Sequence, residues 1–308
     1  MAEVCECTAG LSNTGRPACV PIQAVTSSLI LVPLKDSAQN KNGIDLSVPF
    51  TATTWTDLIN QSDASKRWFP LPHFEEVTLP KADTQFKEAA SGAMAKLRTG
   101  KRSFSGQLWE DDSSPQFLSK LEKAGCVDFG FYIVDVNGNL VGSFDEAANI
   151  LYPIPADKAS WDPKLMFSED DQVSHIQLNF DWYRLFDEGT MRILTATEAG
   201  QDFTELDGLI DVLMFPVFAV AASQTIVFDA KTPYGTALNP IKYLGATLPA
   251  DWGVTVNGAA VVPTAVSEPT NGSYVLTLPA ASFVAADAIV VNVTRDGFSG
   301  TASTTAVA

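Results

Sequence analysis

Alternation of apolar and polar residues is the main signal along this chain, and it predicts β-strands. The clearest example lies within Ser174–Trp182, where four apolar residues alternate with four polar ones. One face of such a strand packs on a core while the other meets water. Similar patterns predict strands at Ser27–Leu34 and Ser103–Trp109, and a hairpin over Val127–Val141.

A short helix with clear start and stop signals is predicted between Ser114 and Gly125. Ser114 is a preferred N-cap residue, and Pro115 suits the first helical position because its missing N–H leaves no bond unmade. Gly125 is placed to end the helix. The apolar stripe of this helix consists of Phe117, Leu118 and Leu121.

Short alternating strands without a helical segment fill the last part of the chain. Asn257-Gly258 favours a type I′ hairpin, because both of its central residues need a positive φ. The runs Tyr274–Leu278 and Ile289–Val293 alternate in the same way, and turn clusters separate them. Strands at this spacing predict an immunoglobulin-like β-sandwich, with the Ser/Thr/Ala-rich last ten residues as a low-complexity tail.

Charge divides the chain into two parts. Residues 1–222 hold 17 basic and 31 acidic side chains, whereas residues 223–308 hold three and five. With 308 residues in all, about two domains are expected. We therefore predict an N-terminal arm at 1–26, a β domain at 27–222 and the sandwich at 223–308. The apolar run Val212–Ala222 is expected to be a buried strand or an interdomain connector.

The net charge of −16 disfavours binding to nucleic acid or to anionic lipid. The residues after Met1 have neither a basic segment nor an apolar one of the kind that a signal peptide contains. The longest apolar run has 11 residues, too few to span a bilayer. These features predict a soluble protein, made in the cytoplasm and without a membrane partner.

The candidates for chemistry are few. His73 and His175 fall in different predicted elements and favour surface or packing roles over acid–base catalysis. The acidic clusters Glu110–Asp112 and Glu169–Asp171 offer paired carboxylates for sugar hydrolysis or metal binding, yet both adjoin turns, so solvated turn residues are the preferred interpretation. The segment Asp135–Asn139 has a fragment of calcium-loop character but is read as a hairpin turn.

Cysteine and tryptophan add no site. Reduced thiols are preferred over a metal site for Cys5, Cys7, Cys19 and Cys126, because no fourth ligand accompanies the first three. The six tryptophans are expected in cores or subunit contacts. The sequence therefore predicts no enzyme, no catalytic residue, no metal ligand and no cofactor.

Three consecutive segments resemble tail tube proteins of long-tailed bacteriophages. They are a strand (KRSFSGQLWE), a capped helix (SSPQFLSKLEKAG) and a hairpin (DFGFYIVDVNGNLVG). The segments GLSNTGRPACVPI and SKRWFPLPHFEEV are also similar to structural proteins of phages that infect Bacteroidetes. The resemblance covers about residues 10–222.

This resemblance implies a mainly β fold, a tail-tube-like β-barrel or sandwich with a flanking short helix. It implies a virion protein, made in the host cytoplasm, whose rings, hexameric as is common in this family, stack into a tube. Genomic DNA would pass through without specific binding, because an acidic lumen repels phosphate. Other tail proteins would be partners, the sandwich would lie outside, and the arm before Ser27 would reach a neighbouring subunit.

Three other functions stay open at this point. A capsid or head-decoration protein would carry the same appended domain, although no long spine helix is visible. A carbohydrate-binding adhesion module would use the sandwich and the tryptophans. A hydrolase would use Asp111 or Asp170.

Overall fold

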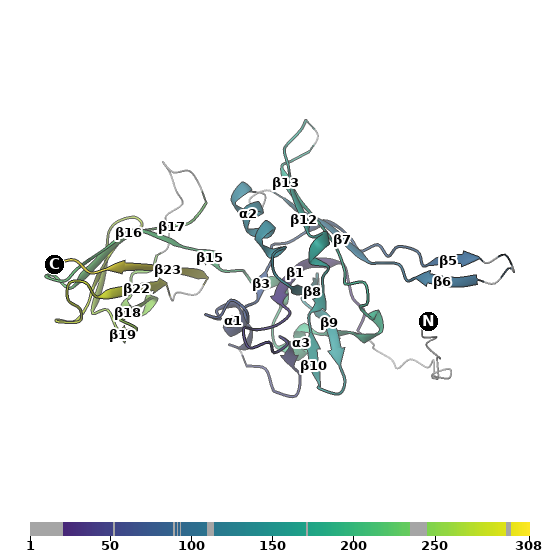
Figure 1. The fold of residues 1–308 in the computed structure, drawn as a ribbon, viewed down its shortest axis with the longest axis horizontal. Coiled ribbons are helices and arrows are strands. Elements are labelled where there is room, and N and C mark those ends of the chain that lie inside the picture. The colour runs from purple at the N-terminus through teal and green to yellow at the C-terminus, as the bar shows by residue number, and fades with distance from the viewer. Residues whose placement is uncertain are drawn as a thin grey trace.

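The computed structural model describes residues 21–51, 53–88, 90, 92, 94–109, 114–170, 172–234, 245–293 and 297–308. The fold is mainly β, as the alternating pattern predicts, and it has two β units (Figure 1). The N-terminal unit holds two packed sheets and a separate hairpin, and the C-terminal unit is a sandwich of two further sheets. Within the described residues, four short 3₁₀ helices lie at Lys158–Ser160, Glu188–Thr190, Phe203–Glu205 and Pro249–Asp251.

The larger sheet of the N-terminal unit has eight strands, six of them on one path. In spatial order these six are β2 (Ile44–Asp45), β10 (Ile150–Tyr152), β9 (Leu140–Asp145), β8 (Phe129–Asp135), β1 (Thr26–Pro33) and β3 (Phe69–Pro70). In addition, β11 (Ile154–Pro155) pairs with β8, and β14 (Met191–Leu194) pairs with β9. The predicted first strand and the predicted β8–β9 hairpin are thereby confirmed.

The smaller sheet of this unit has four strands. Their spatial order is β12 (Asp162–Met166), β13 (His175–Asp181), β7 (Ser103–Trp109) and β4 (Glu75–Thr78). The strands predicted within Ser174–Trp182 and at Ser103–Trp109 are confirmed here as the two central members.

A first core fills the space between these two sheets. The small sheet contributes Phe104 and Phe180, whose rings stack with centroids 5.1 Å apart. The large sheet contributes Phe131 from β8, whose ring meets Phe180 edge-on at 5.0 Å. Because these rings are almost fully buried, they remove a large apolar area from water and hold the sheets together.

A second core covers the opposite face of the large sheet. There Tyr132 and Val134 of β8 pack with Trp55 of α1 (Thr54–Ile59) and with Phe203. The short helix α3 (Ala196–Ala199) adds Ala199, whose carbonyl accepts a hydrogen bond from the Trp55 indole at 3.1 Å. All seven residues of β8 are buried, since the strand lies between both cores.

The predicted helix is α2 (Pro115–Ala124), and it flanks the first core. Ser114 is its N-cap, with the hydroxyl oxygen accepting a hydrogen bond from the Phe117 amide at 3.1 Å. Leu121 is buried, and its carbonyl accepts a bond from the Trp161 indole at 2.7 Å. The helix therefore joins the small sheet through both side-chain packing and a hydrogen bond.

A two-stranded hairpin projects from the N-terminal unit (Figure 1). It consists of β5 (Gln85–Glu88) and β6 (Met94–Arg98), which lie between β4 and β7 in the sequence. The sequence pattern did not predict it. We call residues 80–102 the projecting hairpin.

The C-terminal unit has the strand order of an immunoglobulin-like sandwich. One sheet runs β16 (Leu213–Val220), β17 (Thr225–Lys231), β21 (Ser273–Thr277) and β20 (Ala265–Thr270), the order A-B-E-D. The other runs β15 (Ile210–Asp211), β23 (Phe298–Thr305), β22 (Ala288–Val293), β18 (Trp252–Val256) and β19 (Ala259–Val261), which contains the order G-F-C.

The sandwich starts earlier than the charge division suggests. Strands β15 and β16 both precede residue 222, yet β15 pairs with β23 and β16 pairs with β17. Val212 and Met214 are buried in the same core as Trp252. The run Val212–Ala222 is thus a strand of the sandwich, and this unit begins at Ile210.

Of the segment expected to be an N-terminal arm, the structure describes residues 21–26. The Ala24 amide donates to the Asp135 carboxylate at 3.2 Å, and the Val136 amide donates to the Val25 carbonyl at 2.9 Å. These bonds tie the chain to the β8–β9 turn just before β1 begins.

Candidate functional site

The small sheet has one apolar face and one polar face. Ile176, Leu178 and Phe180 of β13 lie in the first core. The residues between them point the other way, because side chains alternate along a strand. We define the polar sheet face by Ser103, Ser105, Gln107, Gln177, Asn179 and Asp181.

Register aligns these polar residues in rows across the two central strands. Gln177 lies opposite Gln107, and Asn179 lies opposite Ser105. The rows extend outward, so that Lys164 of β12 lies beside Gln177 and Glu75 of β4 lies beside Gln107. The face is therefore a continuous hydrophilic surface across four strands, with uncharged amides and hydroxyls at its centre.

Hydrogen bonds between side chains fix this surface. The Gln177 amide nitrogen donates to the Ser105 hydroxyl at 2.8 Å and to the Asn179 carbonyl oxygen at 3.3 Å. The Gln107 amide nitrogen donates to a Glu76 carboxylate oxygen at 2.8 Å, and its oxygen accepts from the Trp109 indole at 2.7 Å. A network of amides and hydroxyls with one carboxylate hydrogen-bonds to water without attracting phosphate.

Both edges of this sheet are open in the described part of the chain, because β4 and β12 each pair with one strand only. Along β4, the Ser103 amide donates to the Pro80 carbonyl at 3.0 Å, and Thr78 lies opposite Ser105. Backbone groups in an antiparallel pair alternate in direction, so the N–H of Leu79, which lies between the paired positions Thr78 and Pro80, points away from β7. An open edge of this kind is a template for a further strand.

A cluster of ion pairs joins the base of the projecting hairpin to this sheet. The Lys101 ammonium lies 3.1 Å from Asp181 and 3.2 Å from Asp157, and the hydrogen bonds that it donates to these carboxylates raise its pKa. Arg102 lies 3.0 Å from Glu188, and Lys81 lies 3.1 Å from the same residue.

The Arg102 hydrogen bond is the main reason that the pKa of Glu188 lies below its ordinary value. The Arg102 guanidinium also lies over the Trp182 ring, 5.4 Å from its centroid. These contacts fix the direction in which the hairpin leaves the sheet.

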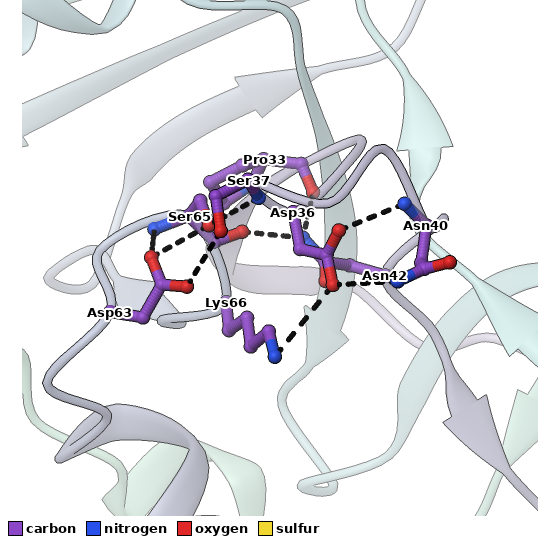
Figure 2. A network of polar contacts seen from close by, with 8 residues as sticks. All are labelled: Pro33, Asp36, Ser37, Asn40, Asn42, Asp63, Ser65 and Lys66. Atoms are coloured by element: carbon purple, nitrogen blue, oxygen red, sulfur yellow. Dashed lines mark hydrogen bonds and ion pairs between the residues drawn. The ribbon is translucent and has the colours of Figure 1, made fainter.

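A second polar network fixes the loops that follow β1 and α1 (Figure 2). Asp36 accepts hydrogen bonds from the backbone and side chain of Asn40 at 2.8 and 3.2 Å, and the side-chain bond is the largest cause of its lowered pKa. Asn42 donates to the carbonyls of Pro33 and Ser65, both at 2.7 Å. The carboxylate accepts from donors of the chain itself, so the network serves to hold loops.

The neighbouring Asp63 also holds loops by accepting hydrogen bonds (Figure 2). It accepts from the Ser65 amide at 2.9 Å and from the Ser37 hydroxyl at 3.2 Å, which ties the two loops to each other. Within the described residues, no group of three or more His, Cys, Asp and Glu side chains is placed to hold a metal ion.

The structure places His73 in an arrangement that sequence patterns did not indicate. Its Nδ1 lies 2.8 Å from the Ser27 hydroxyl, and its Nε2 lies 3.5 Å from a Glu75 carboxylate oxygen. In a catalytic triad the serine faces Nε2 and the acid faces Nδ1, the reverse of this order. Ser27 is also only 6% exposed, so these contacts hold the β3–β4 connection against β1.

The remaining sequence candidates are separate from one another. His175 is buried at the start of β13, with Nδ1 3.0 Å from the Val173 carbonyl. Glu169 and Asp170 are exposed in the β12–β13 connection. Asp171 and the cluster Glu110–Asp112 lie outside the described residues, as do Cys5, Cys7 and Cys19. Cys126 is an exposed free thiol.

The segment Asp135–Asn139 is a turn organised by its first residue. The buried Asp135 carboxylate accepts hydrogen bonds from the amides of Asn137 and Asn139, both at 2.9 Å. It also accepts from the Asn139 side chain at 3.0 Å. The Asp135 carboxylate, which gives the segment its calcium-loop character, thus accepts hydrogen bonds within the turn itself.

The tryptophans pack mainly inside the two units. Trp55, Trp68, Trp182 and Trp252 are buried, and Trp161 is half-buried against Phe129 and Phe180. Trp109 is 38% exposed at one end of the polar sheet face. Five of the six side chains are divided between the separate cores and Trp109 lies apart from them, so they form no shared aromatic platform.

Comparison with known proteins gives no match: no family model, curated protein or solved structure matches this chain. Among the described residues, the helices are all too short or too polar to cross a membrane.

Proposed function

We propose that this chain is a virion structural protein, the subunit of stacked rings that form a bacteriophage tail tube. The observation that carries the proposal is the polar sheet face, which lies between two open edges and has a packed core behind it. In this proposal the polar sheet face lines the lumen. In this proposal each ring is a hexamer, and genomic DNA passes through the rings without specific binding.

The open edges supply a way to close a ring. A sheet edge exposes unpaired N–H and C=O groups, and closing a sheet into a barrel removes such edges. If β4 of one subunit pairs with β12 of the next, the four-stranded sheets join into one inner wall. Pro163 in β12 leaves one position of that edge without a donor, which limits the possible registers.

The chemistry of the polar sheet face suits the passage of DNA. Its central rows carry amides and hydroxyls, which hydrogen-bond to water and hold no positive charge. The chain as a whole has a net charge of −16, which repels a phosphate backbone. A wall of this kind neither binds DNA nor offers it an apolar surface.

The C-terminal sandwich belongs on the outside of the tube in this proposal. Its core is separate from the two cores of the N-terminal unit, and the sequence places most of the acidic charge before it. Contacts with other tail proteins are assigned to this unit and to the ring faces. The site of function is then the tail of the virion, after synthesis in the bacterial host.

The first experiment is negative-stain electron microscopy of the purified protein, with its mass measured in solution. We expect rings or hollow stacked tubes. A protein that remains monomeric at high concentration contradicts the proposal.

A backbone variant at the open edge sharpens this experiment. Leu79→Pro removes the outward-pointing N–H at the end of β4, so we expect it to abolish ring formation. Leu79→Ala is the matched control, because it also removes the leucine side chain but keeps that N–H. Loss of rings in both variants, or in neither, contradicts edge pairing through β4.

A further inference from the structure

The projecting hairpin exposes two large apolar side chains on one face in the described structure. Phe86 is 55% exposed and Met94 is 64% exposed. Phe86 lies opposite Lys96, and Met94 lies opposite Glu88, so all four residues share one face. An isolated two-stranded hairpin is only marginally stable in water. We therefore expect this face to pack against another protein surface.

The hairpin cannot supply that partner by folding back on its own unit. Its base continues the β4–β7 ladder, with the Ala82 amide donating to the Lys101 carbonyl at 2.8 Å. The strands approach closely there, since a Cβ added at Gly100 would lie 1.5 Å from the Ala82 carbonyl oxygen. The ion pairs of Lys101 and Arg102 hold the same base from the side.

Charge also distinguishes the hairpin from the rest of the chain. It holds six of the 20 basic residues and two of the 36 acidic ones, which leaves 14 basic and 34 acidic residues elsewhere. Near its tip, Lys87 and Lys96 are both exposed. Lys81, Lys101 and Arg102 form ion pairs at the base of the hairpin. The exposed Lys87 and Lys96 are therefore the cations that can complement an acidic surface of a second copy.

A groove on the same unit has the matching character. We call it the α3 groove, and it is lined by residues 46–50, Phe144, Leu151, residues 192–194 and residues 197–200. Its volume is about 730 Å³, enough for several side chains. The fully buried Leu151 and the half-buried Phe50 and Phe144 belong to its apolar lining.

Acidic side chains border this groove. Glu198 is part of the lining, and Asp45 accepts a hydrogen bond from the amide of the lining residue Ser47 at 2.9 Å. The lining cation Arg192 lies 3.4 Å from Glu146. The groove and its border therefore hold three carboxylates and one guanidinium, a net negative charge.

We propose that the projecting hairpin of one copy docks in the α3 groove of a second copy. Phe86 and Met94 enter the apolar part, while Lys96 faces the acidic border. The contact joins two different surfaces, so it is head-to-tail and can repeat from copy to copy. It rests on the proposed function in one respect, which is that copies of this chain assemble.

Disulfide capture between two variants tests this contact. In a background with all four cysteines replaced by serine, Lys96→Cys is mixed with Thr197→Cys, which lies in the groove. We expect about tenfold more mixed disulfide than in a mixture of Lys96→Cys with Ser303→Cys, because docking raises the local thiol concentration. Ser303 is exposed on β23 of the C-terminal sandwich.

Equal yields with the groove and control positions overturn the proposed contact. Electron microscopy of the same samples tests the tube proposal independently of the docking contact. Tubes without the groove disulfide overturn the docking contact alone. The disulfide without tubes supports the contact and overturns the tube, and monomers without the disulfide overturn both.

Discussion

Gln177 of β13 lies directly opposite Gln107 of β7, and both side chains stand on the polar sheet face. Their neighbours Leu178 and Leu108 are fully buried in the first core. On each strand, therefore, one residue lies on the polar sheet face and the next lies in the core on the other side of the sheet. The outward positions are free to change charge without disturbing the core.

We expect positive charge on this face to convert a neutral wall into a DNA-binding one. Gln177→Lys together with Asn179→Lys places two cations in adjacent rows. DNA retention by assembled protein, measured by filter binding, should rise and should weaken as salt is added, because counterion release drives such binding.

The control for this variant adds the same charge to the C-terminal sandwich. Ser267 and Thr270 are both exposed on β20, so Ser267→Lys with Thr270→Lys leaves the polar sheet face unchanged. Equal DNA retention by the two variants would show that the face does not line the path of the DNA.

The start of the sandwich at Ile210 makes a prediction about fragments. A fragment of residues 210–308 contains β15 and β16 and should unfold cooperatively in urea. A fragment of residues 223–308 lacks both strands and the buried Met214, so it should give no cooperative transition. Cooperative unfolding of the shorter fragment would place the unit boundary at the charge division instead.

Glu188 should make the stability of the hairpin base depend on pH. Its pKa is lowered in the folded protein, so it stabilises the fold above its ordinary pKa, and this contribution is lost as the pH falls through the lowered value. Glu188→Gln should lower the free energy of unfolding by about 1 kcal/mol at pH 7, the upper range for such pairs.

Urea unfolding at two pH values measures this effect. The difference between Glu188→Gln and the unchanged protein should shrink at about pH 3, where carboxylates are mostly protonated. Glu205→Gln, at an exposed position, is the control and should show little change at either pH. A difference that is constant with pH would mean that the carboxylate charge is not the cause.

Local sequence signals predicted the elements that have a regular apolar–polar alternation, a helix-capping residue or a turn dipeptide. The alternation around Gln177 placed β13, and Ser114 with Pro115 placed the start of α2. Asn257 and Gly258 have φ values of 47° and 84°, as a type I′ turn requires.

Other elements form against their local pattern. The hairpin strands β5 and β6 are rich in Ala, Lys, Glu and Gln, which do not favour strands, and only continuation of the β4–β7 ladder makes them extended. Strand β23 comes from the Ser/Thr/Ala-rich tail and is fixed by pairing with β22. Charge misplaced the sandwich boundary because net charge reports on surfaces, whereas Val212 and Met214 are buried.

The proposed assembly surfaces were only partly visible in the sequence. Alternation predicted a polar face on one strand, but the rows across β12, β13, β7 and β4 depend on register. The open edges depend on which strands remain unpaired. Both are properties of the folded sheet and have no local sequence signature.

Strand β8 has a mechanical consequence. Phe131 and Ile133 belong to the core between the sheets, whereas Tyr132 and Val134 belong to the core on the other side. Because β8 contributes side chains to both cores, a change of packing in one core displaces a strand that is also packed in the other. A force applied to one face of the unit is therefore transmitted to the opposite face. The N-terminal unit should therefore respond to pulling or bending as a stiff block.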